Sequence, residues 1–154
     1  MKSLPKDVRM TAIYIVRGQP RRKQKYRQAQ EEILAGSGVS FVDVGGMSGQ
    51  RCYLPGGKGS TGDPTANKAA ALDALEEKDF VLVMRQVDAA ADLIGRDLPG
   101  PIKKTLRDAV LTSCQRGREY PFERMNVPGF TKSSFYRRRD DFLADVAERL
   151  GLMG

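Results

Sequence analysis

The chain has 154 residues, of which 40% are hydrophobic and 29% are charged. We expect one soluble globular domain with an appendage, because this length is too short for a large multidomain enzyme and this composition does not suit a wholly disordered chain. The sequence contains no histidine. This excludes histidine-dependent nucleophilic catalysis, histidine-ligated zinc and a histidine pH switch.

The chain is basic, with 26 Lys and Arg against 19 Asp and Glu and a net charge of +7. Such a balance favours an anionic partner, most often nucleic acid. Cys52 and Cys114 are too far apart in sequence for a metal-ligand pair, and two cysteines make no disulfide framework. No apolar run approaches the roughly 18 residues of a membrane span, and no apolar region follows charged residues 1–9. We therefore expect a reduced, cytoplasmic protein without membrane association.

The charge is distributed unevenly along the chain. Residues 1–35 hold nine basic and three acidic residues, residues 63–100 hold four and eight, and residues 101–154 hold eleven and seven. Two basic ends thus flank an acidic middle, and an anionic ligand is expected at the ends.

The N-terminal part predicts two helices. Residues 6–17 are apolar on much of the helical circumference, at Val8, Ala12, Ile15 and Val16, which indicates more than one packing neighbour. Gly18 and Pro20 interrupt this pattern. A second helix is expected over residues 20–35, with Tyr26, Ala29 and Ile33 facing inward.

Residues 36–62 contain nine of the sixteen glycines and are expected to form a flexible linker. A phosphate-binding P-loop would need Ser or Thr after Lys58, where this chain has Gly59.

The remaining residues, 63–154, are expected to form a helical domain. Apolar spacing predicts one long helix over residues 63–94 and a second over 101–116, whose inner stripe includes Cys114 as a small core residue. No segment alternates as a strand does. The predicted fold is all-α, with five or six helices, divided into a basic segment 1–35, a linker 36–62 and a domain 63–154.

Residues 120–151 predict a helix-turn-helix. A short helix within 121–126 is followed by a turn at 127–130, and Thr131 caps a long helix over 132–150 that Gly151 ends. At 100° per residue, one stripe faces inward, formed by Phe135, Arg139, Phe142, Leu143, Val146 and Leu150. We expect the head group of Arg139 to reach water or a carboxylate of the acidic middle segment.

The first two turns of this long helix leave six side chains for DNA, namely Lys132, Ser133, Ser134, Tyr136, Arg137 and Arg138. Hydroxyl groups bind phosphate or base edges, and arginine binds guanine O6 and N7 together. The alternative is a solvated helix face whose arginines pair with Asp140, Asp141, Asp145 and Glu148.

A second basic cluster comprises Arg21, Arg22, Lys23, Lys25 and Arg27. These side chains point in several directions on a helix, so they are candidates for contacts with the DNA backbone rather than with bases. A purely solubilising role is an equal alternative.

The chain resembles the RinA/ArpU-type transcriptional regulators of phages and prophages, whose C-terminal half is similar to region 4 of sigma-70 factors. Three segments carry the resemblance, residues 14–34 (YIVRGQPRRKQKYRQAQEEIL), 62–70 (GDPTANKAA) and 131–152 (TKSSFYRRRDDFLADVAERLGL). The resemblance implies binding to a phage promoter and activation of late genes, with Lys132, Ser133, Ser134, Tyr136 and Arg137 reading the DNA.

We therefore expect a non-enzymatic, sequence-specific DNA-binding transcriptional regulator that needs no cofactor or metal. Its partners would be double-stranded DNA, a second copy in a homodimer and, if it acts as an activator, host RNA polymerase. The helices at 6–17 and 63–94 are candidate dimer interfaces. Two alternatives are a small terminase-like DNA-packaging subunit, which would assemble as a ring, and a structural or adaptor protein that binds an acidic partner.

Overall fold

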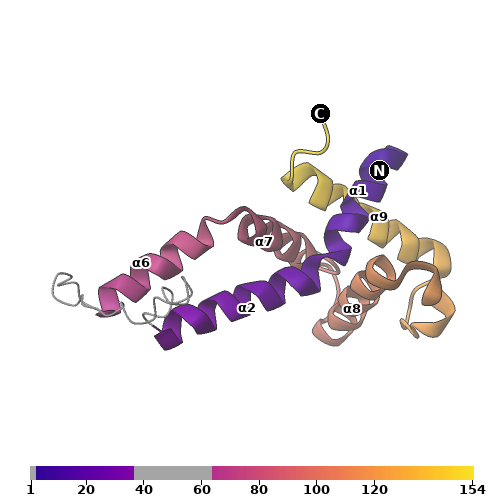
Figure 1. Ribbon diagram of the computed structural model, residues 1–154. Coiled ribbons are helices and arrows are strands. Elements are labelled where there is room, and N and C mark those ends of the chain that lie inside the picture. The colour runs from indigo at the N-terminus through magenta and orange to yellow at the C-terminus, as the bar shows by residue number, and fades with distance from the viewer. Residues whose placement is uncertain (1–2, 37–63) are drawn as a thin grey trace. The chain divides into compact units, whose positions relative to one another are not determined.

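The structure is a computed structural model that describes residues 3–36 and 64–154. No strand occurs in these two ranges, and the all-α prediction is confirmed. The predicted glycine-rich linker lies outside the described residues except for Gly36. The helices are α1 (Lys6–Arg17), α2 (Gln19–Gly36), α6 (Pro64–Glu76), α7 (Asp79–Asp92), α8 (Gly100–Arg116) and α9 (Lys132–Arg149), with short 3-10 helices η2 (Gly117–Glu119) and η3 (Phe122–Arg124) between α8 and α9 (Figure 1).

The chain divides into two compact units. Unit 1 comprises Met1–Pro20 and Val83–Gly154, and unit 2 comprises Arg21–Leu82. The predicted boundaries at residues 35 and 62 differ from those of the compact units, which lie after residues 20 and 82. The reason is that α1 packs with α8 and α9.

The predicted interruption between the first two helices is confirmed at Gly18. Its N–H bonds the carbonyls of Tyr14 and Ile15, both at 3.2 Å, and α2 starts at the next residue. The side chain of Gln19 is buried and donates hydrogen bonds to the Met84 carbonyl at 2.8 Å and to Asp88 Oδ1 at 3.1 Å. A buried amide is thereby satisfied, and the first residue of α2 is tied to α7 within unit 1.

The single long helix predicted over residues 63–94 is wrong, because the structure has two helices there. α6 ends at Glu76, and the N–H groups of Glu77 and Lys78 bond carbonyls three residues back, at 3.2 and 3.1 Å. Such bonds tighten the last turn of a helix. Asp79 then lies in the first turn of α7, where a carboxylate is favourable. The apolar spacing continues across this short break, so periodicity alone does not reveal it.

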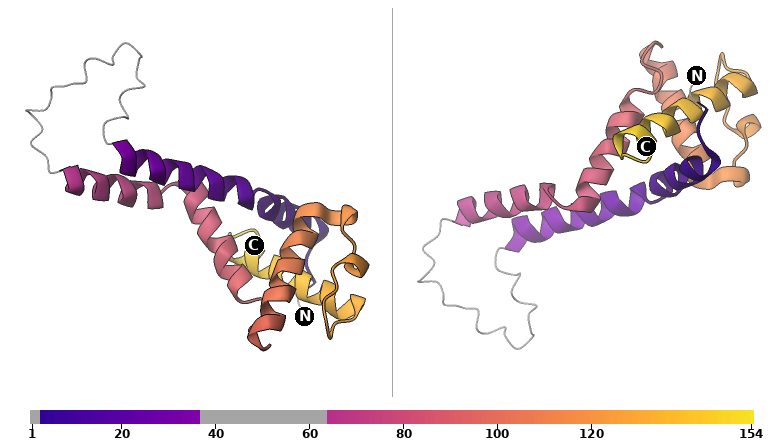
Figure 2. Two further views of the ribbon diagram at one scale, coloured as in Figure 1. Left: turned by 90° about the horizontal axis from the view of Figure 1, so that it is seen from below. Right: turned by 90° about the horizontal axis from the view of Figure 1, so that it is seen from above.

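Unit 2 pairs α2 with α6, which run side by side in opposite directions (Figure 2). The Tyr26 hydroxyl hydrogen-bonds the Glu76 carboxylate, and Gln30 Nε2 lies 3.0 Å from the Tyr26 oxygen. The three side chains predicted to face inward on α2 are only half-buried, whereas Leu75 and Val81 are buried. Tyr26 thus contributes a polar contact rather than core packing.

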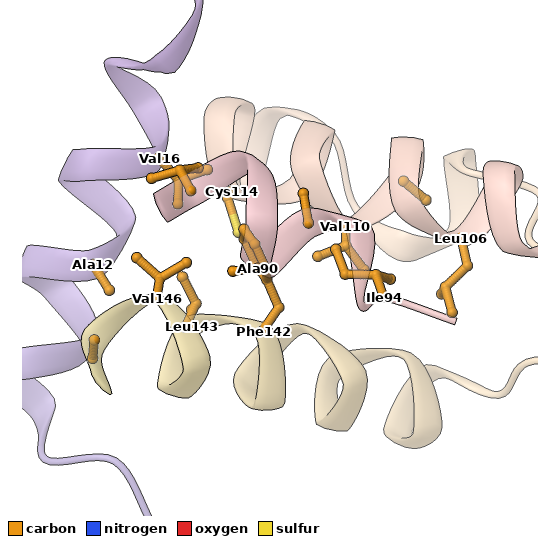
Figure 3. Close-up of a cluster of buried hydrophobic side chains, with 14 of the residues drawn as sticks. Ala12, Val16, Ala90, Ile94, Leu106, Val110, Cys114, Phe142, Leu143 and Val146 are labelled. Carbon is orange, nitrogen blue, oxygen red and sulfur yellow. The ribbon is translucent and has the colours of Figure 1, made fainter. Parts of the chain in front are cut away.

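Unit 1 has a continuous apolar core to which α1, α7, α8 and α9 all contribute. Figure 3 shows its side chains converging from these helices and from the turn after α7, among them Ala12, Val16, Ala90, Ile94, Leu106, Val110, Cys114, Phe142, Leu143 and Val146. α1 contacts both α8 and α9. This confirms the prediction that its broad apolar face has more than one neighbour.

Cys114 is a buried core residue, as predicted. Loss of solvent raises the pKa of its thiol to about 12, because burial disfavours the thiolate. The carbonyl of the same residue accepts a hydrogen bond from Arg17 Nε at 3.0 Å, which links α1 to the end of α8. Gly117 ends α8 with a φ of +59°, a backbone conformation that favours glycine.

Candidate nucleic-acid interface

The start of α9 is defined by a local capping arrangement. Thr131 is the N-cap, and its side-chain oxygen accepts a hydrogen bond from the backbone N–H of Ser134 at 3.2 Å. This satisfies one of the N–H groups that the first turn of every helix leaves free. The predicted N-cap is thus confirmed, and the neighbouring N–H groups at this helix end remain available to an anion.

The inward stripe of α9 is also largely confirmed. Phe135, Phe142, Leu143 and Val146 are buried, and Leu150 is half-buried. The ring of Phe135 lies 5.2 Å from that of Phe122 in η3. These contacts fix the rotation of α9 about its axis, and hence which side chains of its first turns face solvent.

The short helix predicted within residues 121–126 is a single turn of 3-10 helix, η3. It is confined on both sides, since Pro121 precedes it and Asn126 adopts a positive φ of 49°. Pro128 in addition disfavours the α conformation at Val127. The helix-turn-helix predicted at residues 120–151 thus lacks an α-helix as its first member. α9 is supported instead by α1 and α8, with a smaller contact from η3.

Two of the six predicted DNA-binding residues have exposed side chains that form no hydrogen bond or ion pair with the described part of the chain. They are Ser133 and Arg137. Because they are four residues apart on a helix, they lie on the same face one turn apart. This pair is the part of the predicted surface that is open to a ligand.

Lys132 is exposed but has a partner. Its ammonium nitrogen lies 3.2 Å from Oε1 of Glu123 in η3, and the two side chains are 65% and 61% exposed. The carboxylate's pKa is lowered by hydrogen bonds from its own backbone and from Lys132. An ion pair this exposed contributes little to stability and is readily exchanged for another anion.

Arg138 forms a bidentate ion pair with Asp97, which lies in the turn between α7 and α8. Its two terminal nitrogens donate to Oδ1 and Oδ2 of Asp97, each at 2.8 Å. The hydrogen bonds from Arg138 lower the pKa of the Asp97 carboxyl to about 2, and the same contact raises the pKa of the guanidinium. Arg138 also borders an open hollow of about 140 Å³ that Asp141 and Asp145 line.

The other two predicted residues take part in local packing. The Ser134 hydroxyl donates to the Thr131 carbonyl at 3.0 Å, so it is engaged in the cap. Tyr136 is half-buried, with its ring edge-on to Phe135 at 5.3 Å and the Arg139 guanidinium 4.7 Å from its centre. The structure therefore gives these two side chains a supporting role at the start of α9.

A terminal guanidinium nitrogen of Arg139 lies 3.6 Å from Oδ1 of Asp140. No ion pair between Arg139 and the acidic middle segment is found among the described residues. Asp140 also lies 3.5 Å from Arg9 of α1. Packing of α1 against α9 brings this third charge to the site, which helical spacing on one element does not predict.

Positive charge is concentrated in the segment that leads into α9 and in the first two turns of that helix. Residues 116–138 hold six basic and two acidic residues, whereas residues 139–149 hold two and four. One exposed contributor, Arg124, was not among the predicted site residues. It lies in η3, which contacts α9. It lies within the segment that precedes α9, in the predicted short first helix of the helix-turn-helix, and this position is the sequence signal that could have indicated it.

The second basic cluster lies on α2 in unit 2. Four of its members are exposed, namely Arg21, Lys23, Lys25 and Arg27. Arg22 is half-buried, and loss of solvent lowers its pKa. The Lys25 ammonium lies 4.4 Å from the centre of the Phe80 ring, so this cation is partly engaged within the unit.

The described residues contain no group of His, Cys, Asp or Glu side chains arranged to hold a metal ion. None of the helices at 3–36 and 64–154 combines the length and the hydropathy that crossing a bilayer requires. Comparisons with protein-family models, with curated proteins and with solved structures give no match for this chain.

Proposed function

We propose that this protein binds double-stranded DNA with the first two turns of α9 and regulates transcription from a phage or prophage promoter. One observation carries the proposal. The side chains of Ser133 and Arg137 are exposed and have no hydrogen-bond or ion-pair partner among the described residues, and they lie one turn apart at the open end of a helix whose opposite face is buried in the core.

The chemistry of this helix end suits a duplex. The free N–H groups and the positive end of the helix dipole attract phosphate. An arginine without an intramolecular partner is free to bind guanine O6 and N7 together, and a serine hydroxyl binds either a base edge or a phosphate. Recognition helices read bases from these same first turns.

Neighbouring cations add attraction that does not depend on sequence. Arg124 and Lys132 lie close to this helix end, and the exposed basic residues of α2 provide a second cationic surface in unit 2. Each phosphate neutralised by such a side chain releases counterions, which makes binding weaker as salt rises. The α2 cluster therefore contributes backbone contacts in this proposal, and α9 contributes base contacts.

The proposal rests on α9 rather than on a complete helix-turn-helix. Because η3 is one turn long, it offers no extended first helix that could contact RNA polymerase as in a sigma-like unit. Activation of late genes through host RNA polymerase, and action as a homodimer, are expectations that the resemblance adds to DNA binding.

The test is a binding titration of the full chain against a random duplex pool, with selection of the bound molecules and repetition at several salt concentrations. We expect a consensus sequence and a log–log salt slope of about −3.6 to −5.4, for roughly four to six neutralised phosphates. Flat, salt-insensitive binding would favour the adaptor alternative. Light scattering separates the packaging alternative, since a large ring excludes a dimeric regulator.

A further inference from the structure

The contact between Asp97 and Arg138 occupies the part of the guanidinium that DNA would use. Both terminal nitrogens of Arg138 donate to the two carboxylate oxygens of Asp97 at 2.8 Å. A phosphate, or the O6 and N7 atoms of guanine, would take the same two N–H groups in the same geometry. Arg138 therefore binds either Asp97 or DNA in this way, and not both at once.

The surroundings of Arg138 strengthen this competition. Asp141 and Asp145 line the hollow beside it, and Asp141 acts on its guanidinium electrostatically. Arg137, the preceding residue, has no carboxylate partner among the described residues. Arg137 and Arg138 thus differ in their availability to DNA, because only Arg138 contacts the α7–α8 turn.

We propose that Asp97 competes with DNA for Arg138. By keeping Arg138 from binding non-specific DNA, it raises the ratio of the affinity for the recognised sequence to the affinity for a random one. This inference rests on the proposed DNA binding by α9. On a random duplex, Arg138 stays on Asp97 and neutralises no phosphate. On the recognised sequence, contacts made by Arg137 and Ser133 hold the duplex close enough for a base or phosphate to displace the carboxylate.

The chain contains a matched control pair. Asp92 and Arg107 form an ion pair of 3.0 Å, with the arginine 34% and the aspartate 65% exposed, against 35% and 60% for Arg138 and Asp97. Asp92→Asn and Asp97→Asn make the same change in net charge on the same unit. Only the second releases an arginine of the DNA-binding helix.

The experiment measures the affinity of the full-length chain for a random duplex and for a selected duplex, at several salt concentrations. Asp97→Asn is expected to raise affinity for the random duplex about three- to tenfold and to steepen its salt slope by about 0.9, the value for one further phosphate contact. Affinity for the selected duplex rises less, so the ratio between the two falls. Asp97→Asn/Arg138→Ala is expected to lose the whole gain.

The outcomes separate the inference from the function on which it rests. If wild-type protein binds DNA and Asp97→Asn matches Asp92→Asn in affinity and slope, the inference is overturned and DNA binding stands. A gain that persists in the double variant also overturns it. If the wild type binds no DNA, the proposed function fails first. Thermal unfolding of each variant, expected to match wild type because both carboxylates are exposed, confirms that folded proteins are compared.

Discussion

Thr131 and Ser134 close the first turn of α9 through reciprocal hydrogen bonds. The backbone N–H of Thr131 donates to Ser134 Oγ at 3.0 Å, and that of Ser134 donates to Thr131 Oγ1 at 3.2 Å. Each side chain thus satisfies a donor that the helix end leaves without an intrahelical partner. The first turn of α9, which carries Ser133, is held in helical form by two residues that do not themselves need to touch a ligand.

Replacing Thr131 by Ala is therefore expected to lower the free energy of unfolding by about 1 kcal/mol, the usual cost of a lost N-cap. Chemical denaturation measures this change. Thr131→Ser is the control, because it retains the capping oxygen and is expected to remain close to wild type. Equal losses in both variants would show that the methyl group of Thr131, and not its hydroxyl, stabilises the turn.

Arg137→Ala is expected to weaken binding to a selected duplex by about 1–3 kcal/mol without changing the fold. The reason is that the exposed Arg137 side chain has no hydrogen-bond or ion-pair partner among the described residues to lose on truncation, but loses both of its bonds to a base. Arg149→Ala is the control. It removes the same charge from the opposite end of α9, where Arg149 pairs with Asp145 at 2.9 Å. An equal loss on random and selected duplexes would reassign Arg137 to a phosphate contact.

Leu143→Ala is expected to cost about 2–5 kcal/mol of unfolding free energy, since Leu143 is fully buried in the core that α1, α7, α8 and α9 share. Leu93, which is 42% exposed, provides the comparison. Its truncation to Ala is expected to cost well under about 1 kcal/mol. Comparable losses at the two positions would contradict the packing of α9 described above.

The buried thiol of Cys114 predicts a pH dependence of stability at alkaline pH. Its pKa is raised by burial from 9.0 to about 12, so between these values the unfolded chain loses a proton that the folded chain keeps. Stability is fully retained below pH 9 and falls by about 1.4 kcal/mol per pH unit up to pH 12 from this group alone.

The thiol contribution is isolated with variants that differ only at Cys114. In a Cys52→Ala background, unfolding is followed by denaturant from pH 8 to pH 11, with and without the further change Cys114→Ala. The slope attributable to the thiol is expected to vanish in the second variant. Identical slopes would mean that the thiol ionises equally in both states, contrary to its burial.

Much of unit 1 could be predicted from local sequence signals. The spacing of apolar residues in α1, α8 and α9 corresponds to the faces that are buried, and Thr131, Gly117 and Gly151 mark helix ends by their own backbone or capping chemistry. The break between α6 and α7 could not be predicted in this way. It interrupts the backbone hydrogen bonds and leaves the apolar spacing intact.

The sequence by itself determined the helices, the basic ends and which face of α9 is apolar, because each of these depends on residue type and on spacing along one helix. Only the tertiary structure decided which cations at the start of α9 pair with carboxylates of the described residues. Asp97 and Glu123 reach this helix from other elements and form ion pairs with Arg138 and Lys132, whereas Arg137 has no ion-pair partner among the described residues. Arg9 of α1 reaches the same helix and pairs with Asp140. The charges that packing brings together are distant in sequence, so the periodicity of residues along one helix does not predict that they meet.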